Sequence, residues 1–509
     1  HSRRAQRLRA RAAPRVSNFR HARPLKEGGP GGRLELEPAS VEAEPGAVEA
    51  EPASWRDPSG FVYRRDGVVH RQIQPSFAEE WEHFVGSGLH ARLVERGLLL
   101  GHEEGGLEDA FDASAHAVIR PEPIDFISYP YEWTFGELRD AALLTLDAQL
   151  EALSAGMTLR DASAYNVQFR GVQPVLIDSL SFGRMQPDAP WIAYQQFCEH
   201  FLAPLALMAT RDIRCTRLLR GGIDGIPLDL AARLLPGRSR LRLGLGAHLH
   251  LHARSMRQHA DASGSGRKAR LSLSRQSALI ESLRSTVSGL RWEPEGTEWA
   301  DYADHTSYDD EATRSKEAIV GAMLGAAAGS SGAGGGAAVW DLGANTGRYS
   351  AIASGLGRRV LAFDIDPAAA ERHYRSLRRD GRTDTTPLVM DLADPSPALG
   401  WAHRERRSLE ERGGDGVLMA LALVHHLAIG RNVPLPMLLG WLADLGSELI
   451  IEWVPREDPM AQRLLAARED IFGRYTEEGL QAAMVERWVQ VDRAPIVGSA
   501  RVLYHLRRR

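Results

Sequence analysis

The feature that most constrains the fold is a short apolar run that ends in a glycine-lined turn. The run is Val339–Leu342, and the turn that follows contains Gly343, Asn345 and Gly347. Glycine accepts positive φ angles and lets other groups approach its backbone, so this spacing is typical of a strand that turns sharply into a helix. A helix that begins at such a turn points its free N–H groups at it. The segment therefore predicts a strand, a turn and a helix of an open α/β sheet, with a ligand site at the turn.

A second apolar run ends in an acid at the spacing of a nucleoside-binding sheet. This acid, Asp364, lies 23 positions after Asp341, the acid that precedes the glycine turn. An acidic side chain about 20 residues past the turn, at the tip of the second strand, can accept hydrogen bonds from both hydroxyls of a ribose. We therefore predict that Asp364 binds a ribose.

From about Tyr302 to Arg509 the chain resembles the class I S-adenosylmethionine-dependent methyltransferases, whose first motif is similar to Asp341–Gly347. The resemblance implies a Rossmann-like α/β fold, S-adenosylmethionine as the cofactor and methyl transfer as the activity. It continues in a third run, Leu388–Leu392, whose Asp391 stands where the family contacts the adenine amino group. The cofactor-binding residues that we expect are Asp341, Gly343, Asn345, Gly347, Asp364 and Asp391.

Two histidines follow the fourth predicted strand, in a His-His-Leu segment similar to one common in the family's small-molecule members. Ligands of such sheets bind at the carboxyl ends of the strands, and histidine is well matched to proton removal at neutral pH. We therefore take His425 or His426 as the candidate base, and Glu452, near the end of the fifth predicted strand, as a second candidate. The alternative is that the histidine only orients the acceptor or bonds a backbone group, and that Glu452 fixes its tautomer.

A nicotinamide-dependent dehydrogenase fits this domain less well. Its Gly-x-Gly-x-x-Gly motif is absent, because Asn345 occupies the place of the second glycine, where a pyrophosphate requires bare backbone.

The region 55–292 carries a second motif. Asp161 is followed five positions later by Asn166 and 17 positions later by Asp178, and a predicted hairpin lies between the last two. The spacing resembles the catalytic loop of the protein-kinase and aminoglycoside-phosphotransferase superfamily. The resemblance implies that Asp161 accepts a hydroxyl proton and that Asn166 and Asp178 hold Mg²⁺ against nucleotide phosphates. Mg²⁺ is expected only if this domain is an active phosphotransferase.

Three departures weaken the phosphotransferase interpretation. The glycine-rich phosphate loop is absent, Arg71 stands where a lysine is expected, and Leu159 replaces the histidine that precedes the Arg-Asp pair. The planar guanidinium of arginine needs a geometry different from that of a lysine ammonium. We therefore favour a domain that recruits or shapes the acceptor, in which Asp161 caps a turn and Asn166 bonds a loop carbonyl.

Composition divides the chain into four parts. An arginine-rich start and a nearly repeated acidic segment carry too few apolar residues to fold, which predicts a disordered tail. Because the first residue is His rather than Met, we expect the true N-terminus to lie elsewhere. The predicted parts are a tail (1–54), an α+β, possibly kinase-like domain (55–292), a connecting helix and Gly-rich loop (293–338) and a methyltransferase domain (339–509).

Charge and cysteine usage exclude several classes of protein. The net charge of −4 argues against a nucleic-acid partner, since such proteins usually carry a net positive charge. The two cysteines, Cys198 and Cys215, give no disulfide framework or zinc site. A reducing, cytoplasmic setting and no membrane span are expected. Three histidines, 248, 250 and 252, alternate with leucines and would share one face of a strand, but no carboxylate accompanies them and we assign no metal site.

The sequence thus favours methyl transfer to a small-molecule or glycan-like acceptor. A low-specificity resemblance of the segment around Tyr475 to nodulation-type methyltransferases points to a saccharide or lipid-linked acceptor. The alternatives are a bifunctional protein whose N-terminal domain transfers phosphate with Mg²⁺, and a non-catalytic regulator that binds the cofactor.

Overall fold

The computed structural model describes residues 48–254, 271–295, 309–327, 338–466 and 468–509. Most of the predicted tail, residues 255–270 and part of the predicted Gly-rich loop lie outside the described residues. Contacts divide the chain into two units, and the larger one comprises residues 45–509. Within the described residues, no helix is long and apolar enough to cross a membrane.

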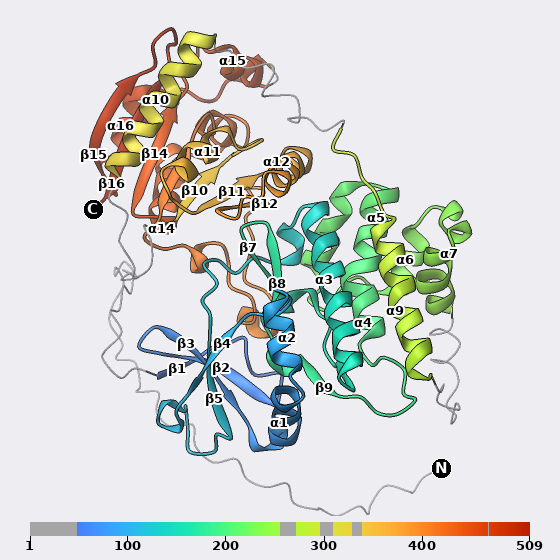
Figure 1. Ribbon diagram of the computed structural model, residues 1–509. Coiled ribbons are helices and arrows are strands. Elements are labelled where there is room, and N and C mark those ends of the chain that lie inside the picture. The colour runs from blue at the N-terminus through green and yellow to red at the C-terminus, as the bar shows by residue number, and fades with distance from the viewer. Residues whose placement is uncertain (1–47, 255–270, 296–308, 328–337, 467) are drawn as a thin grey trace, which may run out of the picture. The chain divides into compact units, whose positions relative to one another are not determined.

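An antiparallel sheet of five strands opens the N-terminal region (Figure 1). The apolar segments on either side of Arg65–Gly67 predict a hairpin, and the structure confirms it: β2 and β3 are joined by Asp66 and Gly67, which both have positive φ, as a tight hairpin turn requires. The prediction of a disordered tail to residue 54 is wrong at its end, because β1 pairs with β2 and so satisfies its backbone groups. The sheet order is β1-β2-β3-β5-β4, with bounds β1 Val48–Ala50, β2 Gly60–Arg65, β3 Val68–Ile73, β4 His102–Gly105 and β5 Ala117–Pro121.

The helix after this hairpin is broken in two. The apolar spacing of Phe77–Arg96 predicts a single amphipathic helix. Gly88 instead adopts a left-handed conformation (φ 71°) between α1, Ala78–Gly86, and α2, Leu89–Glu95, so the structure has two helices.

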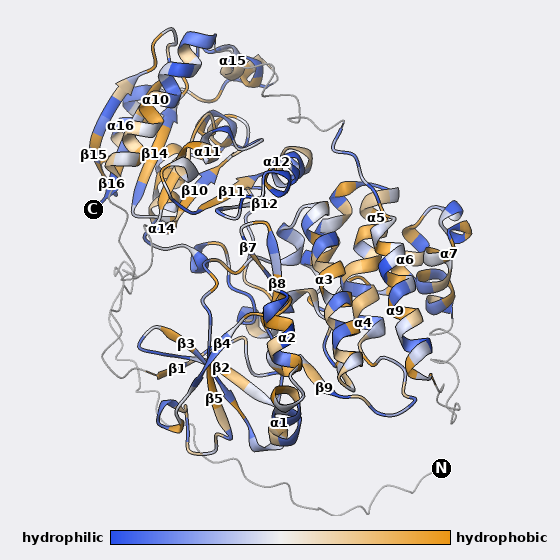
Figure 2. Cartoon of the chain, viewed as in Figure 1, coloured by the Kyte–Doolittle hydropathy of each residue, from blue (hydrophilic) through white to orange (hydrophobic). Residues whose placement is uncertain are grey.

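A long buried helix, α3 (Phe135–Ser154), forms the core of the region that follows. The Thr134 hydroxyl accepts the N–H of Glu137, and the Glu137 carboxylate accepts the N–H of Thr134, so a capping box fixes where α3 begins. In Figure 2, α3 and α9 carry both apolar and polar residues, as helices with one buried face do. The strands and α-helices described in this region are β6 Met157–Leu159, β7 Val167–Arg170, β8 Gln173–Leu176, β9 Phe182–Arg184, α4 Tyr194–Phe197, α5 Ala203–Thr210, α6 Leu228–Leu234, α7 Leu243–Leu245 and α9 Leu273–Ser288.

The Leu-His alternation does not form a strand. Residues Gly246–Leu251 form a π-helical turn, and His248 bonds the Tyr194 hydroxyl at 2.8 Å and the Ser282 hydroxyl at 2.9 Å. His250 bonds Ser239 instead, so the imidazoles point to different partners. In the ranges that the structure describes, no group of three or more His, Cys, Asp or Glu side chains could hold a metal ion.

The C-terminal region is a seven-stranded sheet in the order β12-β11-β10-β13-β14-β16-β15. The strands β10 to β14 are parallel and buried on both faces, which explains their continuous apolar runs. The antiparallel β16 pairs with β14 and forms a hairpin with β15. This sheet confirms the predicted Rossmann-like, class I methyltransferase fold. The strand bounds are β10 Val339–Leu342, β11 Val360–Asp364, β12 Thr385–Val389, β13 Val417–Ala420, β14 Glu448–Trp453, β15 Trp488–Pro495 and β16 Val502–Arg508.

Helices cover the two faces of this sheet (Figure 1). The predicted helix before the Gly-rich loop is confirmed as α10, and Asp309 caps it by accepting the N–H of Ala312 at 2.8 Å. The helix bounds are α10 Asp310–Ala326, α11 Arg348–Gly355, α12 Pro367–Arg379, α13 Val424–Ala428, α14 Leu435–Leu445, α15 Pro459–Ala466 and α16 Glu477–Met484.

Candidate active site

The glycine turn lies between β10 and α11. Gly343 (φ 88°), Asn345 (φ 49°) and Gly347 (φ 87°) all adopt the left-handed conformation that the turn requires. A Cβ at Gly343 would touch only the Leu423 side chain, at 3.6 Å, whereas a Cβ at Gly347 would overlap the ring of His373. The backbone at Gly343 is therefore open to a ligand, while Gly347 is required by protein packing.

The second strand meets the turn through Asp364. One carboxylate oxygen of Asp364 accepts the N–H of Asn345 at 2.7 Å, and the other accepts the N–H of Asp366 at 2.8 Å. Asp341 also lies at this edge of the sheet, where it accepts the Ser350 hydroxyl at 2.6 Å. The glycine turn and the acid predicted to bind ribose are thus neighbours, tied by a direct hydrogen bond.

Both buried carboxylates are less acidic than usual. Burial raises the pKa of Asp341 to about 6, opposed by the Ser350 hydrogen bond and by the positive charge of Lys316. Burial likewise raises the pKa of Asp364 to about 6, opposed by the two backbone N–H donors. The two side chains therefore change charge near pH 6 rather than near pH 4.

Asp391 lies just beyond β12 and is partly exposed. Its carboxylate accepts the N–H of Ala393 at 3.0 Å and lies 3.4 Å from Arg431 Nη2. The preceding Met390 donates its N–H to the Asp364 carbonyl at 2.7 Å, so the segment that carries Asp391 lies beside the end of β11.

His425 and His426 lie on α13, directly after β13, and their ring centroids are 4.0 Å apart. His425 is fully buried, and neither of its ring nitrogens has a hydrogen-bond partner among the described residues. Burial, the neighbouring His426 and nearby cations hold the pKa of His425 well below its usual value, and burial lowers the pKa of His426 to about 4. Both imidazoles are therefore neutral at pH 7, and His425 carries polar atoms that a ligand could satisfy.

Glu452 forms the centre of a buried ion network. Its carboxylate accepts Lys316 Nζ at 2.7 Å, the N–H of Ala422 at 2.7 Å and Arg501 Nη1 at 3.3 Å. Arg501 also donates to Asp458 at 2.7 and 3.0 Å. Glu452 thus binds the backbone just ahead of the His425 helix, which places it as a group that positions α13.

The N-terminal motif is also brought together. Asp161 accepts the N–H of Ser163 and the Gln196 amide, each at 2.8 Å, and is hydrogen-bonded to Asn166. Ser181 connects the other two residues, because it accepts from Asn166 at 3.1 Å and donates to Asp178 at 2.8 Å. Burial raises the pKa of Asp161.

Arg71 forms an ion pair with Asp178, the residue to which the kinase resemblance assigns metal binding. Its Nη1 lies 2.6 Å from Asp178 Oδ1, and the guanidinium is mostly buried. Asp178 also accepts the N–H of Leu180 at 2.9 Å. A buried cation already neutralises this carboxylate, so the residues present do not fit a Mg²⁺ site.

No protein-family model matches the chain. The nodulation protein NoeA of Rhizobium meliloti strain 1021 is 34% identical over 464 residues, which cover 89% of this chain and 95% of that protein. The chain belongs to the NoeA family.

Two of the similar solved structures are methyltransferases. Magnesium protoporphyrin IX methyltransferase of Synechocystis PCC 6803 has 14% identity, a TM-score of 0.30 and coverage of 40% of this chain and 89% of its own. The bifunctional kinase-methyltransferase WbdD has 15% identity, a TM-score of 0.29 and coverage of 43% and 44%.

Sequence reasoning missed Lys316 and Arg501, which come from α10 and from the residue before β16. One signal for Lys316 was available: it lies four residues after Ala312 and four before Val320, on the buried face of α10. A charge in an apolar stripe indicates a buried partner.

Proposed function

We propose that this member of the NoeA family transfers a methyl group from S-adenosylmethionine to a small-molecule or glycan-like acceptor. The observation that carries the proposal is the hydrogen bond from Asn345 N–H to Asp364. It joins an open glycine turn to an acidic strand tip at the carboxyl edge of a parallel sheet, where such folds bind nucleosides.

The residues present fit the cofactor. The open backbone at Gly343 leaves room for a ligand, and Asp364 and Asp391 offer carboxylates at adjacent strand ends. We infer that Asp364 accepts the ribose hydroxyls and that Asp391 lies near the adenine. When bound, S-adenosylmethionine supplies a methyl group that is already activated on a sulfonium, so the protein has mainly to align the acceptor.

His425 is the group we assign to the acceptor. A hydroxyl or a protonated amine must lose a proton as it is methylated, and a neutral imidazole with two unpartnered nitrogens can accept that hydrogen bond. Burial and the nearby cations Lys316 and Arg501 disfavour the charged imidazolium, so His425 stays neutral and, in this proposal, orients the acceptor by a hydrogen bond rather than keeping its proton. Glu452 holds the start of α13 and so orients this ring.

The N-terminal domain, residues 55–292, selects the acceptor in this proposal. It contacts the methyltransferase domain through buried groups: Glu132 pairs with Arg412 at 2.6 Å, and Glu371 accepts the N–H of Gly136 at 2.8 Å. Such buried polar contacts fix an orientation because any displacement leaves charges unpaired. Both cysteines are free, which agrees with the cytoplasmic setting that we include in the proposal.

Calorimetric titration with S-adenosylhomocysteine tests the cofactor site. Wild-type protein should bind, Asp364→Ala should bind at least about tenfold more weakly, and Asp380→Ala, at a half-exposed position of the same domain, should bind normally. Unchanged affinity in Asp364→Ala would refute the assignment of the ribose site.

Labelled S-adenosylmethionine and fractionated cell extract then test the transfer. The wild-type protein should label one fraction, whereas His425→Ala should retain cofactor affinity and lose most of the label. Binding without any labelled product would favour the non-catalytic regulator.

The phosphotransferase alternative has its own test. Arg71 beside Asp178 predicts no thermal shift with ATP and Mg²⁺. A Mg²⁺-dependent shift that Asp178→Ala abolishes would establish nucleotide binding and revive the bifunctional alternative.

A further inference from the structure

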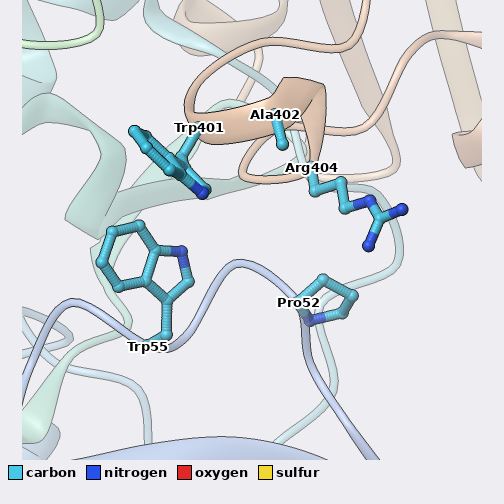
Figure 3. A pocket seen from close by; sticks show the side chains of 5 residues that line it. All are labelled: Pro52, Trp55, Trp401, Ala402 and Arg404. Carbon is cyan, nitrogen blue, oxygen red and sulfur yellow. The ribbon is translucent and has the colours of Figure 1, made fainter. Parts of the chain in front are cut away.

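A cavity of about 680 Å³ lies between the segment that precedes β2 and the connection from β12 to β13. Its walls carry two tryptophans, Trp55 and Trp401, together with Pro52, Ala402 and Arg404. Figure 3 shows Trp401 and Arg404 on one side of the space and Trp55 and Pro52 on the other. The volume is within the range of about 300–1,000 Å³ that is common for small-ligand sites. We call it the tryptophan pocket.

The two indoles are unusually exposed for their size. Trp55 is 54% exposed and Trp401 is 71% exposed. Large aromatic side chains gain stability by burial, so a pair left in water at one cavity indicates a surface that binds something.

Ion pairs hold the two walls of the tryptophan pocket together. Arg56, next to Trp55, donates two hydrogen bonds to Glu405 at 2.7 and 2.8 Å, and Glu405 also accepts the N–H of Trp401 at 2.9 Å. A second pair, Arg407 with Glu51, joins the same two segments at 2.9 Å. The cavity is therefore preformed, which reduces the entropy lost when a ligand binds.

The backbone on the Trp401 wall is held in an uncommon conformation. Ala402 (φ 52°) and His403 (φ 57°) are consecutive left-handed residues that are not glycine. Such residues persist where the surrounding structure fixes them, and they are frequent at ligand sites. Here they place Trp401 and Arg404 on the same wall.

The lining side chains of the tryptophan pocket restrict the chemical class of ligand that it can bind. The lining side chains offer hydrogen-bond donors only, from the guanidinium and the indole N–H groups, and no acceptor. The positive charge of Arg404 in the lining disfavours a cation. The faces of indole rings are electron-rich and attract the C–H groups of an apolar ring face. A ligand with C–H faces and a rim of oxygen acceptors meets all three conditions.

We propose that the tryptophan pocket binds a saccharide, with pyranose faces against Trp55 and Trp401 and hydroxyl or carboxylate oxygens at Arg404. The connection that carries Trp401 leaves the carboxyl edge of the methyltransferase sheet, where an acceptor is expected. In so far as this saccharide is the methyl acceptor or part of it, the inference rests on the proposed function.

The test titrates the full chain with maltotriose, triacetylchitotriose and trigalacturonate, and with AMP as a stacking ligand of another class. Binding is measured by calorimetry and by quenching of tryptophan fluorescence. At least one saccharide should bind, and Trp55→Ala and Trp401→Ala should each weaken it about tenfold or more. Met437→Ala, an equally exposed apolar position on α14, should leave the affinity unchanged.

The outcomes separate this inference from the proposed function. The tryptophan variants should keep the wild-type affinity for S-adenosylhomocysteine. Three results would overturn the saccharide pocket: no saccharide binding, binding of AMP alone, or a saccharide affinity that neither substitution changes. None of them would affect the evidence from cofactor binding. Saccharide binding without cofactor binding would instead support the pocket and refute the proposed methyl transfer.

Discussion

Two glycines of the cofactor turn have nearly the same φ but different surroundings. Substituting each with alanine therefore separates the cost of the backbone conformation from the cost of packing the new methyl group. Gly343 has φ 88°, and a Cβ there would make only an ordinary contact with Leu423, whereas Gly347 has φ 87° and faces the ring of His373. We expect Gly343→Ala and Gly347→Ala to lose the same free energy of folding through the backbone conformation, but different amounts through packing of the new methyl group.

The magnitudes follow from these two contributions. A left-handed residue other than glycine costs about 1–2 kcal/mol, and this applies to both variants. At Gly347 the new methyl also overlaps a buried ring on α12, and overpacking of this kind costs about 1–3 kcal/mol more. The expected destabilisation is therefore about 1–2 kcal/mol for Gly343→Ala and about 2–5 kcal/mol for Gly347→Ala.

A double-mutant cycle with His373→Ala measures the packing contribution directly. Denaturant unfolding gives the free energy of each variant, and Gly347→Ala should cost about 1–3 kcal/mol less in the His373→Ala background. In a titration with S-adenosylhomocysteine, Gly343→Ala should lose more affinity than Gly347→Ala, because its methyl enters the space left for the ligand. The same cost for Gly347→Ala in both backgrounds would refute the reasoning, as would a Gly343→Ala variant that binds normally.

Three further predictions concern charge. Glu452→Gln leaves the buried Lys316 without its anion and should destabilise the protein by about 3–5 kcal/mol, whereas Asp444→Asn, which breaks an exposed pair, should cost under about 1 kcal/mol in the same unfolding assay. Affinity for S-adenosylhomocysteine should be full well above pH 6 and fall as the pH drops through about 6, because the Asp364 carboxylate that accepts ribose hydroxyls then becomes protonated. A calorimetric pH series that stays flat to pH 5 would contradict this. Arg71→Met should lower the melting temperature, because it leaves Asp178 partly buried without its cation, and a melting temperature equal to the wild type would show that the ion pair contributes nothing.

Local signals were sufficient to predict the methyltransferase sheet. Glycines 343 and 347 mark the turn, and parallel strands buried on both faces read as unbroken apolar runs, so their order along the chain could be predicted. The break at Gly88 was missed because the apolar spacing continues on both sides of it. Strand β1 was missed because its stability comes from pairing with β2 and not from its own acidic sequence.

The site was less predictable because its groups come from distant segments. The sequence placed Asp364 and the turn at one site, but it did not indicate that Lys316 reaches Glu452 from a helix 136 positions earlier. The tryptophan pocket shows the same limit. Trp55 and Trp401 lie in irregular segments without periodicity, and only the folded chain shows that Arg56 and Glu405 join them.

Tyr165 connects the N-terminal motif to the β12–β13 connection of the methyltransferase domain. Tyr165 precedes Asn166 in the motif that resembles a catalytic loop, and the guanidinium of Arg406 lies 4.2 Å above its ring. Arg406 belongs to the β12–β13 connection, the same segment that carries Trp401. In the same connection, Arg412 forms a buried pair with Glu132. A loop that would have to admit a nucleotide in a phosphotransferase is thus contacted by the methyltransferase domain. The N-terminal domain therefore fixes the connection that, in our proposal, binds the saccharide, so that acceptor selection and methyl transfer depend on one shared segment.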